Sequence, residues 1–243
     1  KSGSEIFCES ISELSISDVS IISSIENNNY YFLSATKFKE GANISINDCN
    51  FVNVGLFDLL DESFGDVRIS DCNIVSNKPI NTMGKPIYNL QIDDVVLNCQ
   101  EFAVNGVVTL NISDTTLTVA KNFDIKAEKL VIDDCLFNIS GDFKASLEAN
   151  VSVTSSQSRI EDTGIECRGF KIESQEGFNK TLKYAQFKLY ASTYEDSGID
   201  KVIISEKTII EANTYAFKSI KMISYTEEFY IRISDLKQSE DSL

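Results

Sequence analysis

An octet that recurs six times constrains the fold of this chain more than any other feature. Its pattern is an apolar residue, any residue, isoleucine, any residue, aspartate, two further residues and a second apolar residue. Successive copies start 30, 23, 23, 20 and 20 residues apart, which indicates a solenoid whose loops vary in length. The copies begin at Leu14, Ile44, Val67, Leu90, Leu110 and Leu130.

The octet reads as a short strand, because its first and third positions are apolar and would point to the same side of an extended chain. Further β-type runs, such as Val107–Leu110 and Thr116–Val119, lie between the copies, and no long helical stripe follows any of them. One such unit cannot close its own core. We therefore expect parallel stacking, with interior columns of like side chains about 4.8 Å apart.

The run from Ile46 to Gly55, Ile-Asn-Asp-Cys-Asn-Phe-Val-Asn-Val-Gly, resembles the pectin-lyase-like right-handed parallel β-helix superfamily, particularly its surface and adhesin-type members. The resemblance covers residues 14–158 and implies the right-handed coil. Enzymes and nonenzymes share this motif, so it indicates architecture rather than activity.

A leucine-rich-repeat solenoid is the alternative fold, because the run from Ile44 to Phe51 also fits its strand signature. The expected Cys is present in only three copies, with Val95 and Thr115 among the residues that replace it, and no leucine-bearing helical half follows.

The repeat weakens after residue 137, where the aspartate is lost. We predict a lead-in or cap at 1–13, regular coils over 14–158, and over 159–243 an irregular continuation or a second β-rich region. A continuous solenoid to about residue 235 is the preferred interpretation. It depends on five later alternations: Phe170 with Ile172, Phe187 with Leu189, Val202 with Ile204, Ile220 with Met222, and Ile231 with Ile233.

The chain is acidic, with 22 Lys and Arg against 37 Asp and Glu and a net charge of −15. This balance predicts no binding to nucleic acid or to anionic membrane surfaces. The longest apolar runs, such as Val202–Ile204, are far shorter than the roughly 18 residues of a membrane span, so no membrane insertion is expected. Residues 1–5 lack a methionine and a signal-type core, and we interpret the chain as part of a longer protein.

Cys49, Cys72 and Cys135 occupy the same repeat position. Stacking would bring Cys49 and Cys72 within the Cα separation that a disulfide permits, and the alternative is a column of buried free thiols. The chain also holds five N-x-[ST] sequons, which are glycosylation candidates in a secreted protein: Asn43, Asn111, Asn138, Asn150 and Asn179.

The recurring aspartate is the most enzyme-like feature, because paired carboxylates can divide acid and base roles. An aspartate in every coil is, however, typical of a turn residue whose carboxylate accepts backbone N–H groups. Shared calcium ions are a third interpretation, since stacked carboxylates repel one another. The calcium candidates are Asp48, Asp71, Asp94, Asp114 and Asp134.

Polysaccharide lyases and polygalacturonases of this fold use His or Arg beside their carboxylates, whereas this chain has no His and only four scattered Arg. We therefore expect no catalytic residues and no required cofactor. The leading hypothesis is a secreted or cell-surface structural or adhesive segment, which could also serve as an assembly subunit, with protein or glycan partners and neighbouring domains. The alternative is a carbohydrate-binding or polysaccharide-cleaving β-helix that uses the aspartates or a lateral groove.

Overall fold

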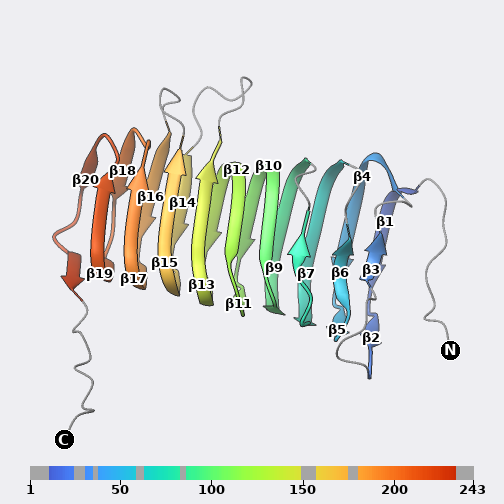
Figure 1. The fold of residues 1–243 in the computed structure, drawn as a ribbon. Helices are drawn as coiled ribbons and strands as arrows, with labels where there is room; N and C mark the ends of the chain where they lie inside the picture. The colour runs from blue at the N-terminus through green and yellow to red at the C-terminus, as the bar shows by residue number, and fades with distance from the viewer. Residues whose placement is uncertain are drawn as a thin grey trace, which may run out of the picture.

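The computed structural model describes residues 11–24, 31–34, 38–58, 63–82, 86–148, 157–174 and 180–233, and these residues form strands without a helix. The strands stack in parallel along one axis as a right-handed parallel β-helix (Figure 1). This confirms the predicted fold class. The leucine-rich alternative is set aside, because neighbouring coils pair as parallel strands on each of three sides.

The strands, in chain order, are β1 Ile11–Ser17, β2 Ser20–Ile22, β3 Tyr31–Ser34, β4 Phe38–Asn47, β5 Asn50–Val52, β6 Gly55–Asp58, β7 Phe64–Val75, β8 Ile80–Asn81, β9 Ile87–Cys99, β10 Phe102–Ser113, β11 Thr116–Val119, β12 Phe123–Asp133, β13 Leu136–Leu147, β14 Gln157–Glu161, β15 Gly164–Ser174, β16 Thr181–Ala185, β17 Phe187–Ser197, β18 Lys201–Ile204, β19 Thr208–Lys218, β20 Met222–Ser224 and β21 Phe229–Ile233.

The octet forms the first side of each coil, and its copies pair in register. Ile16 lies beside Ile46, and Ile112 lies beside Ile132. The isoleucines of the interior coils are fully buried, as the alternation predicts. The same column continues beyond the last clear copy through Ile160, Tyr184 and Ile204.

The aspartate that follows the first side is a left-handed turn residue. All six repeat aspartates and Asp162 have φ between 45° and 57°, and Gln186 takes the same conformation at 47°. Asp and Asn tolerate this region better than most residues do, so the recurring aspartate lets the chain turn sharply onto the second side. At Asp18 and Asp48 the carboxylate accepts from the side chain of the preceding residue, rather than from the backbone N–H groups that we expected.

The second side carries an interior column that includes Phe51, Leu117 and Phe137. The third side carries an aromatic column that the octet does not contain. Its rings stack at centroid separations of 4.6, 5.0, 4.8 and 5.6 Å through five consecutive coils, in the order Phe102, Phe123, Phe143, Phe170 and Tyr194.

The strand ladder runs through the second half of the chain to β21 (Figure 1). Most of the alternations expected there form strands, but they lie on different sides of the coil. Phe170 and Ile172 lie on the third side, whereas Leu189 and Ile231 lie on the second. The first side is instead continued by strands β14, β16, β18 and β20.

Candidate functional site

The aspartate turns form an exposed row along one edge of the solenoid. Partial desolvation raises the pKa of Asp71, and the carboxylates of Asp48 and Asp94 raise it further. The pKa of Asp114 is raised in the same way, with Asp134 as the strongest neighbouring charge. A shallow hollow of about 300 Å³ lies between the turns at Asp114 and Asp134.

Each of the five calcium candidates thus occupies one turn in successive coils. Within the described part of the chain, no three His, Cys, Asp or Glu side chains converge on a point where a metal ion could bind. Calcium binding along this row stays a prediction, which thermal melting with and without millimolar Ca²⁺ would test.

The hydrogen bonds made by the residue after the turn aspartate explain why cysteine recurs at that position. The Cys72 thiol donates to the Ser70 carbonyl at 2.9 Å, and the Thr115 hydroxyl donates to the Ser113 carbonyl at 2.7 Å. The backbone N–H of Cys49 donates to Cys72 Sγ at 3.4 Å. In the coils that have Cys or Thr at this position, the side chain therefore closes the turn as a donor and can link it to the neighbouring coil as an acceptor, which is why Cys and Thr interchange there, whereas Val19 and Val95 fill the position without hydrogen bonds from the side chain.

The five described cysteines are buried free thiols, and Cys8 lies outside the described residues. Burial raises the pKa of Cys72 to about 11 and that of Cys135 to about 12. A thiolate is the reactive form, so these side chains are suited to packing rather than to chemistry. The sequence left a Cys49–Cys72 bridge and buried free thiols as alternatives, and thiol counting can distinguish them.

Three sequons lie on described strands, and Asn150 and Asn179 lie outside the described residues. Asn138 is exposed on β13, and Asn111 is half-buried on β10. Asn43 is exposed, and its Oδ1 accepts from the backbone N–H of Asp66 at 2.8 Å. Asn43 and Asn138 are therefore the two exposed glycosylation candidates among the three.

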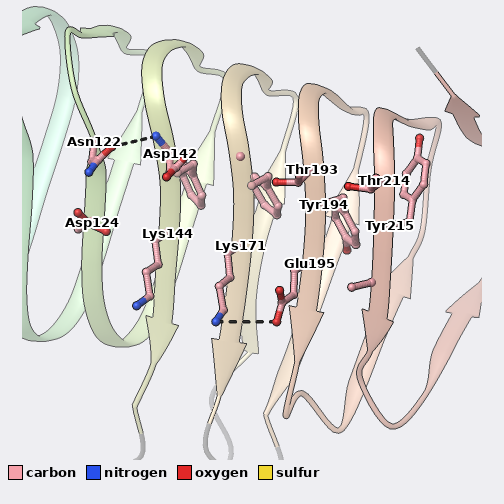
Figure 2. Close-up of a pocket in the computed structure, with 14 residues that line it drawn as sticks. Asn122, Asp124, Asp142, Lys144, Lys171, Thr193, Tyr194, Glu195, Thr214 and Tyr215 are labelled. Carbon is pink, nitrogen blue, oxygen red and sulfur yellow. Dashed lines mark hydrogen bonds and ion pairs between the residues drawn. The ribbon is translucent and has the colours of Figure 1, made fainter. Parts of the chain in front are cut away.

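A lateral groove of about 460 Å³ runs along the third side, across β12, β13, β15, β17 and β19 (Figure 2). The aromatic column points inward beneath it, and two outward rows form its walls. Gly169 lacks a side chain where the groove crosses β15, and an added Cβ would come within 3.0 Å of Asp142 Oδ1 and of Thr193 Oγ1. One wall contains Asn122, Asp142, Gly169, Thr193 and Thr214, and the other contains Asp124, Lys144, Lys171, Glu195 and Ala216.

Charged side chains of both signs line this groove. Lys171 lies 3.8 Å from Glu195, an ion pair that Figure 2 shows across two neighbouring strands. Arg168 donates to both carboxylate oxygens of Asp142, at 2.8 and 2.7 Å, and this bidentate contact holds the pKa of Asp142 below its usual value. Burial raises the pKa of Asp124, although the nearby Lys144 opposes the change.

The groove therefore holds two carboxyl groups on neighbouring coils whose environments move their pKa values in opposite directions. Such a pair can divide the roles of proton donor and base. Sequence reasoning anticipated a lateral groove in general terms but did not identify these residues. The available signal was the recurrence of Phe102, Phe123 and Phe143 at coil spacing, because the sequence neighbours of Phe123 and Phe143 belong to the groove walls.

A buried carboxylate lies behind the groove. Asp196 is fully buried and accepts a hydrogen bond from the Tyr194 hydroxyl at 2.9 Å. Its other oxygen accepts from the backbone N–H groups of Lys218 and Ser219, at 3.1 and 2.8 Å. Asp196 therefore stabilises the turn of the following coil through hydrogen bonds, which is a structural role.

Comparison with protein-family models, with curated proteins and with solved structures finds no match. In the described ranges, no helix is long and apolar enough to cross a membrane.

Proposed function

We propose that this chain is a noncatalytic structural or adhesive segment of a longer secreted or cell-surface protein, related in architecture to the surface-type members of the pectin-lyase-like superfamily. The observation that supports this proposal is the unbroken interior. Columns of buried side chains run from Ile44 to Ala212, and the described strands of each coil pair with strands of the next coil. A stack of this kind is a stiff rod, because each coil contacts only its neighbours and cannot bend without breaking the ladder.

Outward polar side chains add a second ladder along the rod. Asn73 donates to Asn50 at 2.8 Å, Ser70 donates to Asn47 at 2.7 Å, and Asn89 donates to Asp66 at 2.7 Å. These bonds join consecutive coils across the solvent-facing surface. Such a surface would suit a spacer that holds a neighbouring domain away from its attachment point.

Two measurements test the two parts of this proposal. Small-angle scattering of the chain should give the profile of an elongated rod, and a compact particle would contradict the spacer role. Beads coated with the chain should remain on cell or matrix layers under flow better than beads coated with an unrelated acidic protein. Equal retention of both bead types would contradict the adhesive role.

A second candidate function is binding or cleavage of a glycan in the lateral groove. The observation that favours it is the pair formed by Asp124 and Asp142, whose pKa values move in opposite directions, with Lys144 next to Asp124 and Lys171 on the following coil of the same groove. The first carboxyl could act as a general acid and the second as a base or nucleophile. The hydroxyls of Thr193 and Thr214 lie on the wall that contains Asp142, and they could donate hydrogen bonds to sugar hydroxyls and accept hydrogen bonds from them.

Binding and cleavage of acidic and neutral polysaccharides should be measured on the parent chain, on two groove variants and on one control variant. Asp124→Asn should abolish cleavage, and Lys171→Ala should weaken the binding of acidic polysaccharides. Lys201→Ala is the matched control, since it removes an exposed lysine from the first side, on β18. Equal binding by the parent chain and both lysine variants would exclude the groove as the glycan site.

A further inference from the structure

A row of basic side chains lies on the outward face of the first side, in the C-terminal half of the solenoid. The first-side strands of five consecutive coils, β12, β14, β16, β18 and β20, each contribute one cation, on the strand or directly before it. The inward neighbours of these cations are apolar, so the cations point to solvent. This basic stripe consists of Lys129, Arg159, Lys183, Lys201 and Lys221.

The basic stripe is not a general feature of the repeat. The matching five-residue segments of the first side begin at positions 13, 43, 66, 89 and 109 in the N-terminal half, and at 129, 157, 181, 201 and 221 in the C-terminal half. The first set holds one basic and three acidic residues, whereas the second holds five basic and two acidic residues. The face therefore changes from acidic to basic along a chain whose net charge is −15.

Two carboxylates neutralise part of the basic stripe. Arg159 lies 3.5 Å from Asp133 and 3.3 Å from Glu161, and Lys183 lies 2.7 Å from Glu161. In the part of the chain that the structure describes, the other three lysines of the stripe form no ion pair. Five cations and two carboxylates leave three positive charges in excess on this face.

The aspartate row that borders the first side does not follow the whole stripe. Asp162 takes the turn after β14, whereas Gln186 takes the turn after β16. Glu206 follows β18, but Lys207 comes directly after it, and acidic residues return only after β20, at positions 227 and 228. The basic stripe is therefore least opposed by carboxylates at β16 and β18.

Two isoleucines add apolar surface to this face. Ile203 lies in register with Lys183, and Ile223 lies in register with Ile203, so both side chains point outward, where they are half-buried. Each isoleucine follows a lysine of the stripe by two residues. Such a face is complementary to a chain that alternates carboxylates with apolar side chains.

We propose that the basic stripe binds an acidic segment of a protein partner, whose carboxylates contact the lysines and whose apolar side chains cover Ile203 and Ile223. A polysaccharide would match the charges but would leave the isoleucines without an apolar partner. The net charge of the chain repels an acidic partner at long range, but at physiological salt this repulsion is largely screened beyond about 8 Å. The proposal goes beyond the proposed function, since a soluble partner would bind as well as a surface-bound one.

Fluorescence anisotropy with a labelled peptide that alternates Glu and Leu tests the proposal. A peptide of about eight residues can cross the five strands, at about 3.3 Å per residue against about 4.8 Å per strand. The parent chain should bind it, and Lys201→Glu with Lys221→Glu should weaken binding by about tenfold or more. Ile203→Ser with Ile223→Ser should weaken binding of this peptide but not of a peptide that alternates Glu and Ser.

Lys39→Glu with Lys121→Glu is the matched control, because these exposed lysines lie outside the basic stripe and their reversal changes the net charge equally. This variant should bind the Glu–Leu peptide as the parent chain does, and thermal melting checks that each variant is folded. Equal weakening by both pairs of lysine reversals would overturn the proposal. So would no binding by the parent chain up to about 500 µM peptide, tighter binding of polygalacturonate at the same lysines, or dimers of the parent chain that Lys201→Glu abolishes.

Discussion

Replacing Phe143 by alanine should destabilise the fold by about 3–5 kcal/mol, the usual loss for a buried phenylalanine. Phe143 is fully buried in the aromatic column, with ring centroids 5.0 Å from Phe123 and 4.8 Å from Phe170. The interplanar angles of 14° and 9° show that both contacts are stacked. The backbones above and below are held at the strand spacing of about 4.8 Å, so the cavity cannot collapse easily.

Phe217→Ala is the matched control, because Phe217 lies at the C-terminal end and is 42% exposed. Its loss should be about 1 kcal/mol, since much of the ring is already in water. A double-mutant cycle on Phe143 and Phe170 should show a coupling of about 0.5–1.5 kcal/mol, the typical contribution of an aromatic pair.

The assay is urea unfolding followed by circular dichroism, in which the free energy of unfolding is extrapolated to water. A solenoid can lose cooperativity between coils, so the slope with denaturant must be compared among variants before the free energies are. A loss below about 1 kcal/mol for Phe143→Ala, or a loss equal to that of Phe217→Ala, would refute a rigid stacked column.

Three further predictions follow from the turns, the carboxylates and the thiols. Asp94→Val should lower the free energy of unfolding by about 1–3 kcal/mol, because a β-branched residue is strained at a φ of 49°. Asp94→Asn should change it little, because Asn tolerates this conformation. Equal urea midpoints for the two variants would contradict this prediction. The raised pKa of Asp114 means that its carboxyl group binds a proton more tightly in the folded state than in the unfolded state. Lowering the pH from 7 toward 3.8, the ordinary pKa of the group, should therefore increase the free energy of unfolding through Asp114. Asp114→Asn should remove that increase. Asp142 acts in the opposite direction, because its lowered pKa contributes stability that is lost as the pH falls below 3.8, and urea midpoints from pH 3 to 7 would show both effects. The native thiols should react slowly with a disulfide reagent at pH 8, since burial raises the pKa of Cys99 and Cys167 to about 12, and unfolding without reductant should reveal all six; a count of four would indicate a disulfide.

Sequence and structure agree most closely over the first side of the coil. The octet places an apolar residue, an isoleucine and an aspartate at fixed offsets, and the structure buries the first two and turns at the third. In the second half the same reasoning found alternation but did not say which side of the coil each alternating run forms. Phe170 with Ile172 is one example and Ile231 with Ile233 is another. Every side of a three-sided coil buries alternate residues, so alternation identifies a strand without saying which side it forms.

The candidate sites show the same limit. Sequence reasoning selected the aspartate row because the residues recur, and the structure shows that they recur because each coil needs a left-handed turn. The groove residues do not recur as a motif. Asp142 and Arg168 are 26 residues apart, and they form an ion pair only because neighbouring coils pair in one register.

The sequence by itself determined the repeat, the coil length, the interior columns of the first side and the turns at the six repeat aspartates, because these depend on local alternation and on the preferences of single residues. Only the tertiary structure decided the aromatic column, the lateral groove and the basic stripe. These features depend on which residues of different coils become neighbours, and that is determined by loop lengths and strand register rather than by any single stretch of sequence.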